Sequence, residues 1–221
     1  MNKDTKKLTT AAMLCALAYV VMLVGRIPIS SMDFLKYDPK DIIITIGGFI
    51  YGPLTALIIT VIVSLIEMVT VSTTGIIGFV MNVVQSCAFA CTAAYFYKRK
   101  HTLQGAVKGL VVGCFTATVV MLLWNYFLTP IYMGMPREAV AEMLLPVFLP
   151  FNLIKGAINV ALTILVYKHA VTALRAANLI PPSKNNEPAK NSGQMIVLAI
   201  VLLAVCILEV LIMKGIITLP F

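Results

Sequence analysis

Long apolar runs alternate with short polar segments along almost the whole chain. Seven such runs can be traced, over residues 8–24, 42–51, 54–71, 76–97, 106–128, 144–174 and 195–213. A helix needs about 20 mainly apolar residues to cross the hydrocarbon layer of a bilayer, with a range of about 17 to 25. The run at 42–51 is short for a full crossing, so we expect it to start earlier, to tilt or to be held by neighbouring helices. The pattern predicts an all-α membrane protein.

The composition supports a lipid environment. Of the 221 residues, 60% are hydrophobic and 12% are charged, and the mean hydropathy is +0.97. Soluble domains carry about 25% charged residues. A soluble fold of this composition would expose large apolar patches to water, whereas a bilayer solvates the same surface. The composition therefore excludes an ordinary soluble domain.

The positive charge lies in short clusters between the apolar runs. The net charge is +8, and the basic residues gather near the N-terminus, at 98–100 and at 175–190. Counting spans places all three clusters on one side of the membrane, which the positive-inside rule makes cytoplasmic. The N-terminus is then cytoplasmic, the C-terminal residue Phe221 is outside, and the charge is no sign of nucleic-acid binding.

The chain divides into three parts. Residues 1–174 hold six spans, 175–193 form a polar linker rich in Pro and Asn, and 194–214 form an additional C-terminal transmembrane helix. The last helix carries few polar side chains, which is typical of a simple lipid-facing anchor. Alternatively, it pairs with a partner protein through Ala204 or Glu209.

A stripe of polar side chains lies in the sixth span. Asn152, Lys155 and Asn159 are spaced by three and four residues, which places them on one helical face. Polar residues inside a membrane span are costly and usually functional. The stripe could bind a neutral molecule with hydroxyls and carbonyls, or an anion. Alternatively, Lys155 extends to the interface and the amides bond to neighbouring helices.

Other spans contribute further candidates. Asn125 lies among apolar residues in the fifth span and needs a hydrogen-bond partner. The nearby Trp124 and Tyr132 form either an interfacial belt or the aromatic walls of a pocket. Glu67 in the third span pairs with Lys155, Lys36 or Arg26, or couples transport to protons. Asp38 belongs to an outer loop, and loops of this kind often cover a pocket.

Motifs for catalysis or ATP use are missing from the sequence. It contains no GxxxxGK[ST] phosphate loop, no GxSxG elbow and no HExxH pair, and its five cysteines have no metal-type grouping. We therefore expect no enzyme activity, no metal and no cofactor.

Five segments together resemble the riboflavin-binding substrate subunits of energy-coupling factor (ECF) transporters. The segments are LKYDPKD at 35–41, GFIYGP at 48–53, GIIG at 75–78 with Asn82, WNYFLTPIY at 124–132 and PFNLIKG at 150–156. The resemblance covers residues 8 to about 174. The additional C-terminal helix departs from the family pattern.

The resemblance implies a six-helix protein in a bacterial plasma membrane that captures riboflavin, the transported ligand, from outside. It also implies three partner subunits, namely a transmembrane coupling protein and two cytoplasmic ATPases. Asn125, Asn152 and Lys155 match the ligand-binding positions of the family, and Asp38, Glu67, Asn82 and Asn159 complete the candidate set. Ala12 and Ala16 match the pair of small residues that docks on the coupling protein.

Two alternatives remain at the level of the sequence. One is a subunit of the same class that captures another vitamin. The other is an autonomous secondary transporter in which Glu67 and Lys155 form a coupling pair.

Overall fold

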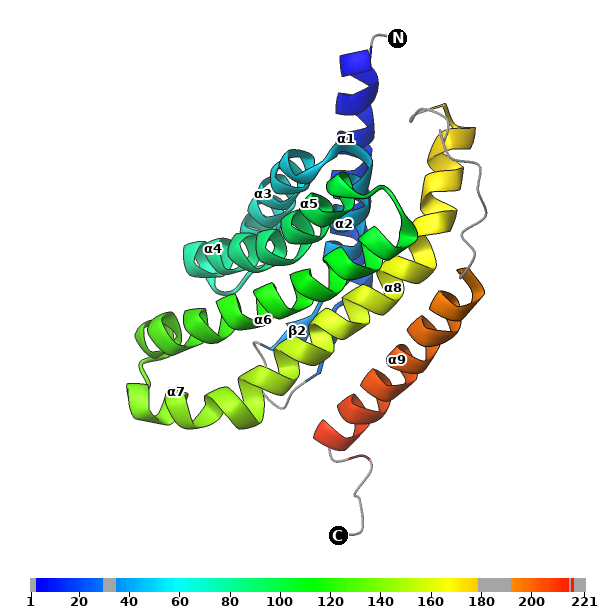
Figure 1. Ribbon diagram of the computed structural model, residues 1–221. Helices are drawn as coiled ribbons and strands as arrows, with labels where there is room; N and C mark the ends of the chain where they lie inside the picture. The colour runs from blue at the N-terminus through cyan, green and yellow to red at the C-terminus, as the bar shows by residue number, and fades with distance from the viewer. Residues whose placement is uncertain (1–2, 30–34, 179–191, 215, 217–221) are drawn as a thin grey trace.

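The fold is a bundle of helices with one short hairpin (Figure 1). The computed structural model describes residues 3–29, 35–178, 192–214 and 216. The elements are α1 (Lys3–Gly25), β1 (Ile27–Pro28), β2 (Lys36–Tyr37), α2 (Lys40–Tyr51), α3 (Pro53–Thr70), α4 (Gly75–Ser86), the π-helical turn η1 (Cys87–Cys91), α5 (Thr92–Arg99), α6 (Leu103–Met133), α7 (Arg137–Met143), the π-helical turn η2 (Leu144–Phe148), α8 (Leu149–Ala176) and α9 (Ser192–Met213).

Six helical stretches in the described part of the chain are long and apolar enough to cross a membrane. They are Asp4–Gly25, Pro53–Thr70, Gly75–Arg99, Leu103–Met133, Arg137–Leu174 and Gly193–Met213. The all-α membrane fold expected from the sequence is therefore confirmed.

The short helix α2 is supported by protein and not by lipid. It has 12 residues, and every residue from Lys40 to Phe49 is buried. The sequence left three explanations open for the short run at 42–51, and the structure selects packing against neighbouring helices. A helix this deeply enclosed can hold charged residues only where they find partners.

Two long spans contain a π-helical turn. The turn η1 lies in the span Gly75–Arg99, and η2 lies in the span Arg137–Leu174. Pro150 is in the first turn of α8, as expected. However, α7 and η2 precede α8 without a break, so this span begins at Arg137 and not near residue 144. Proline has no N–H and clashes with the carbonyl four residues before it, and a wider turn accommodates it. Such turns are frequent at functional sites.

Close approach of small residues holds the centre of the bundle together. A Cβ at Gly113 of α6 would lie 2.6 Å from the carbonyl oxygen of Phe89, and one at Gly156 of α8 would lie 2.4 Å from Sγ of Cys114. Helices in a membrane associate through such close contacts because lipid gives no hydrophobic driving force between them. The polar faces of α4, α6 and α8 are consequently held in fixed positions.

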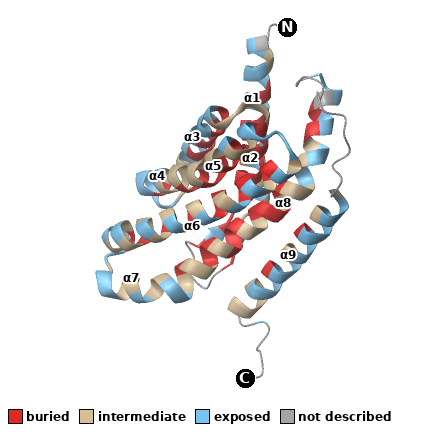
Figure 2. Ribbon diagram, viewed as in Figure 1, coloured by how far each residue is buried: buried red, intermediate tan, exposed pale blue. Residues whose placement is uncertain are grey.

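The C-terminal helix α9 lies along α8 and is largely exposed (Figures 1 and 2). In its most apolar window only 11% of residues are buried, against 50% for the span from Arg137 to Leu174. Ala199 and Cys206 are buried, and Cys206 belongs to the apolar cluster that includes Phe151 and Ile154 of α8. The linker residues 179–191 and Phe221, on which the sequence analysis also made predictions, lie outside the described residues.

Candidate ligand-binding site

A single cavity collects most of the predicted site residues. It has a volume of about 240 Å³ and lies between the end of α1, the segment after β2, the end of α3, and the facing sides of α4, α6 and α8. This is slightly below the range of about 300 to 1,000 Å³ that is typical of small-molecule sites. Six of the seven predicted candidates line it, namely Asp38, Glu67, Asn82, Asn125, Asn152 and Lys155.

Two asparagines in the cavity wall have defined orientations. Asn152 Nδ2 donates to the carbonyl oxygen of Phe148 at 2.7 Å, so its Oδ1 is the group left for a ligand. Asn125 Oδ1 accepts from Thr129 Oγ1 at 2.9 Å, so its Nδ2 is left to donate. Both side chains are buried. Because an amide has distinct donor and acceptor ends, these bonds determine what each asparagine offers.

Lys155 provides a cationic donor beside the two amides. Its Nζ donates to Oε1 of Gln85 at 2.7 Å and lies 4.0 Å from Oδ2 of Asp38. The side chain is buried, so it does not extend to the membrane interface, which was the alternative for this residue. An ammonium group has three donors, and one remains available after these two contacts.

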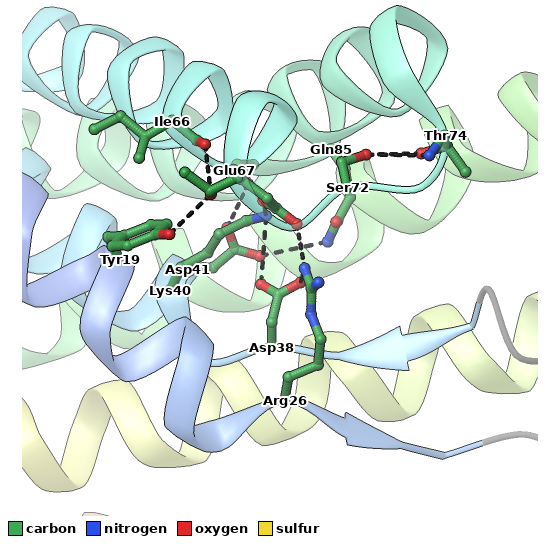
Figure 3. Close-up of polar contacts among 12 residues, drawn as sticks. Tyr19, Arg26, Asp38, Lys40, Asp41, Ile66, Glu67, Ser72, Thr74 and Gln85 are labelled. Atoms are coloured by element: carbon green, nitrogen blue, oxygen red, sulfur yellow. Dashed lines mark hydrogen bonds and ion pairs between the residues drawn. The ribbon is translucent and has the colours of Figure 1, made fainter.

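An ion-pair cluster closes one side of the cavity (Figure 3). Lys40 Nζ lies 2.5 Å from Oε2 of Glu67 and 3.6 Å from Oδ1 of Asp38. Arg26 contacts the other oxygen of Glu67 and lies 4.0 Å from Asp38 Oδ2. Of the three partners predicted for Glu67, the structure therefore selects Arg26, and it adds Lys40.

This arrangement argues against the coupling pair of a secondary transporter. Among the described residues, Glu67 is held by Arg26 and Lys40, while Lys155 contacts Gln85 and Asp38. Glu67 and Lys155 therefore do not form the ion pair that this alternative required.

A second polar cluster, the Asp41 hub, lies next to the cavity. The carboxylate of Asp41 accepts from Ser86 Oγ, from Gln85 Nε2 at 3.4 Å and from Asn159 Nδ2 at 3.3 Å. Asn159 Oδ1 accepts in turn from the hydroxyl of Tyr37 at 3.0 Å. Asn159 is thus in the hub and, unlike the other six candidates, is not part of the cavity lining.

Charged side chains of both signs meet at the site. The buried ones are the cations Lys40 and Lys155 and the carboxyl groups of Asp38, Asp41 and Glu67, and the cavity is also lined by Arg26 and the exposed Lys36. Three donors converge on the carboxyl group of Asp41, which accepts from each of them.

Asp38 is ionised at neutral pH. Burial alone raises the pKa of its carboxyl, but Lys40, Lys155 and Arg26 together outweigh this and hold the pKa below its ordinary value.

The aromatic residues divide between the cavity and the outer surface. Tyr132 and Phe151 line the cavity. Trp124 does not, and instead lines a separate apolar hollow with residues that include Ile76 and Ile131. Ile76 and Ile131 are strongly exposed, so this hollow faces the surroundings of the bundle.

Three residues of the site were missed in the sequence analysis, namely Lys40, Asp41 and Gln85. Gln85 stands in the apolar run 76–97, so the rule that selected Asn125 and Asn152 would have found it. Lys40 and Asp41 stand at the polar edge of a short run and look like loop residues, and only the burial of α2 places them inside the protein.

Ala12 and Ala16 are both exposed on α1. Neither lines the cavity. Their exposure leaves this face of α1 accessible to another helix.

Comparison with known proteins identifies the class. Residues 6–167 match the family described as the substrate-specific component of ECF transporters. The chain therefore belongs to this family, as the resemblance predicted. The match ends before α9.

The relatives it resembles are riboflavin transporters. The riboflavin transporter FmnP of Bacillus subtilis (strain 168) is 28% identical over 172 residues, which cover 73% of this chain and 90% of that protein. The riboflavin transporter RibU of Staphylococcus aureus (strain TCH60) is 28% identical over 180 residues, which cover 78% of this chain and 94% of that protein.

A solved structure shows the same architecture. It is described as the S component of a bacterial ECF transporter, and it superposes with a TM-score of 0.67 at 27% sequence identity, over 78% of this chain and 99% of the other. The family and the fold together establish a membrane transport component.

Proposed function

We propose that this protein captures riboflavin on the outer side of a bacterial plasma membrane, with its N-terminus in the cytoplasm. The observation that carries the proposal is the set of hydrogen-bonding groups that line the cavity. Asn152 offers an acceptor, while Asn125 and Lys155 offer donors. The relatives named as riboflavin transporters support the same ligand.

These groups complement the polar edge of a flavin ring. Its pyrimidine part presents a carbonyl, an N–H and a second carbonyl in sequence, which needs a donor, an acceptor and a donor in the protein. In our proposal, Asn152 Oδ1 accepts from the ring N–H, and Asn125 and Lys155 donate to the two carbonyls. Buried donors and acceptors left unpaired are costly, so this match favours an imide ring over rings with another pattern.

The ion-pair cluster suits the ribityl chain of the ligand. Arg26 Nε and Asp38 Oδ1 are buried and have no hydrogen-bond partner among the described residues, although Asp38 is ion-paired. A hydroxyl both donates and accepts, so it can serve either atom. We propose that Glu67 and Asn82 act from the remaining wall of the cavity.

The chain supplies binding, and we propose that other subunits supply energy. In this proposal it acts with a transmembrane coupling protein and two cytoplasmic ATPases, and it performs no covalent chemistry. The exposed pair Ala12 and Ala16 on α1 would be the docking face, because small residues allow close helix approach.

A binding assay with flavin analogues tests the ligand. Purified protein is stripped of flavin and titrated with riboflavin, N3-methylriboflavin, lumiflavin and thiamine, with quenching of flavin fluorescence as the signal. We expect riboflavin to bind tightly and thiamine not to compete. N3-methylation blocks the N–H and leaves Asn152 unpaired, which lowers affinity about 10- to 100-fold.

Lumiflavin keeps the ring but lacks the ribityl chain, so it should bind more weakly than riboflavin and more tightly than thiamine. Undiminished binding of N3-methylriboflavin would contradict the proposed orientation of the ring. If thiamine binds and riboflavin does not, the ligand is another vitamin, and the protein remains a capture subunit of the same class.

A further inference from the structure

We propose that Asp41 is a positioning residue that fixes the Lys155 ammonium in the ligand cavity through the amide of Gln85. The inference rests on the proposed function, because it concerns how the same site is held in its binding geometry. Asp41 is not part of the cavity lining, and its effect on the ligand is therefore indirect.

The first step is the orientation of Gln85. Asp41 is fully buried, and its carboxyl group is the acceptor in three side-chain hydrogen bonds. Gln85 Nε2 lies 3.4 Å from Asp41 Oδ2 (Figure 3), so the amide must turn its Oε1 the other way. That oxygen accepts from Lys155 Nζ at 2.7 Å. The carboxylate thereby determines that Lys155 meets an acceptor on this side of the cavity.

A second amide is oriented by the same carboxylate. Asn159 Nδ2 donates to Asp41 Oδ2 at 3.3 Å, and the opposite end of this amide accepts from the Tyr37 hydroxyl at 3.0 Å. Tyr37 belongs to β2, next to Asp38. One carboxylate on α2 therefore sets the hydrogen bonds of α4, α8 and the hairpin around the cavity.

Replacing this carboxylate with an apolar side chain of similar size should disturb Lys155. Gln85 Nε2 and Asn159 Nδ2 both donate to Oδ2 of Asp41, so an asparagine could still offer its oxygen to both, whereas Asp41→Leu removes the shared acceptor. Gln85 is then no longer oriented, and a rotated amide would point donors at the Lys155 ammonium, which is itself only a donor. The ammonium then loses its 2.7 Å partner and its fixed place.

A double-mutant cycle tests this pathway. The full chain is prepared as Asp41→Leu, Lys155→Met and the double variant, and riboflavin affinity is measured for each alongside the wild type. We expect each single variant to weaken binding about 10-fold or more, and Asp41→Leu to change affinity by less than about 2-fold once Lys155 is methionine. The visible absorption spectrum of bound flavin in Asp41→Leu should shift toward that of Lys155→Met.

Ser86→Ala is the matched comparison. It removes a hydrogen bond to Asp41 but leaves the contacts of Gln85 with Asp41 and Lys155 in place. We expect it to lower thermal stability while riboflavin affinity changes by less than about 3-fold. If Asp41→Leu does not fold, Gln85→Leu interrupts the same pathway at its middle and is used in the same cycle with Lys155→Met.

Additive losses in the cycle, or wild-type affinity in Asp41→Leu, would overturn the inference while the proposed function stands. Equal losses of affinity in Ser86→Ala and Asp41→Leu would overturn it as well, since the effect would then be structural. A wild-type protein that binds no riboflavin would overturn the proposed function and this inference together.

Discussion

The orientation of each buried amide in the cavity matters because a buried polar group left without a partner is costly. Asn125 and Asn152 are each committed to a local partner at one end of the amide, so each presents the opposite end to a ligand. Under the proposed function, the backbone carbonyl of Phe148 and the hydroxyl of Thr129 thus help to determine ligand choice, because they fix the amide end that each asparagine turns to the ligand.

We predict that Asn152→Leu and Lys155→Met each weaken riboflavin binding by about 10- to 100-fold, because a buried carbonyl or N–H of the flavin loses its partner. Fluorescence titration of the purified variants measures this. Thr163→Val is the control on the same helix, since Thr163 is buried and its Oγ1 has no partner among the described residues. If Asn152→Leu and Lys155→Met bind riboflavin as tightly as Thr163→Val does, the polar face of α8 is structural and does not bind the ligand.

At the scale of elements, the short helix α2 is what places charge next to the cavity. It is enclosed on all sides, and its first two residues, Lys40 and Asp41, are both buried. Lys40 joins the ion-pair cluster and Asp41 forms the hub. A helix that spanned the membrane fully would have carried these residues to the interface, where they would have met water and not the cavity.

For the docking face on α1, we predict that Ala16→Leu abolishes riboflavin uptake by cells that hold the partner subunits, because a larger side chain prevents close approach of another helix. Riboflavin affinity of the purified protein should stay within about 2-fold of the wild-type value. Uptake of labelled riboflavin and co-purification of the coupling protein measure the effect. Ala204→Leu is the same change on the exposed side of α9. Loss of uptake with Ala204→Leu alone would move the docking face to α9.

At the scale of the whole molecule, the C-terminal helix α9 lies apart from the cavity. No described residue of α9 lines the cavity, and the family match ends at residue 167. In Figure 1, α1 begins and α9 ends at opposite ends of the molecule. We propose that residues 1–174 form the binding unit, that 175–193 form a linker and that 194–214 form a separate transmembrane helix.

We accordingly predict that a chain truncated after Asn178 binds riboflavin with an affinity within about 3-fold of the full chain, because lipid can replace α9 on the face of α8 at little cost. Titration of both proteins in lipid nanodiscs checks this. Melting temperatures measured in parallel separate a loss of stability from a loss of binding. A large loss of affinity in a folded truncated protein would make α9 part of the binding unit.

The sequence by itself determined that the fold is all-α and crosses a membrane, because apolar run lengths follow directly from bilayer thickness. Of its seven apolar runs, six correspond to helices in the described part of the chain that are long enough to cross, and the short run at 42–51 does not. It also selected Asn125, Asn152 and Lys155, because polar residues inside a span are rare enough to stand out. Within α8, helical periodicity was sufficient to place Asn152, Lys155 and Asn159 on one face.

The tertiary structure alone decided which of these groups meet. Gln85 and Asp41 are 44 residues apart, Lys155 and Gln85 are 70 apart, and Asn159 and Asp41 are 118 apart. Local periodicity defines the face of each helix but not its rotation against another, which depends on packing such as that of Gly156 against Cys114. For this reason most of the candidate residues that line the cavity could be predicted from the sequence, whereas the buried contacts of Asp41 could not.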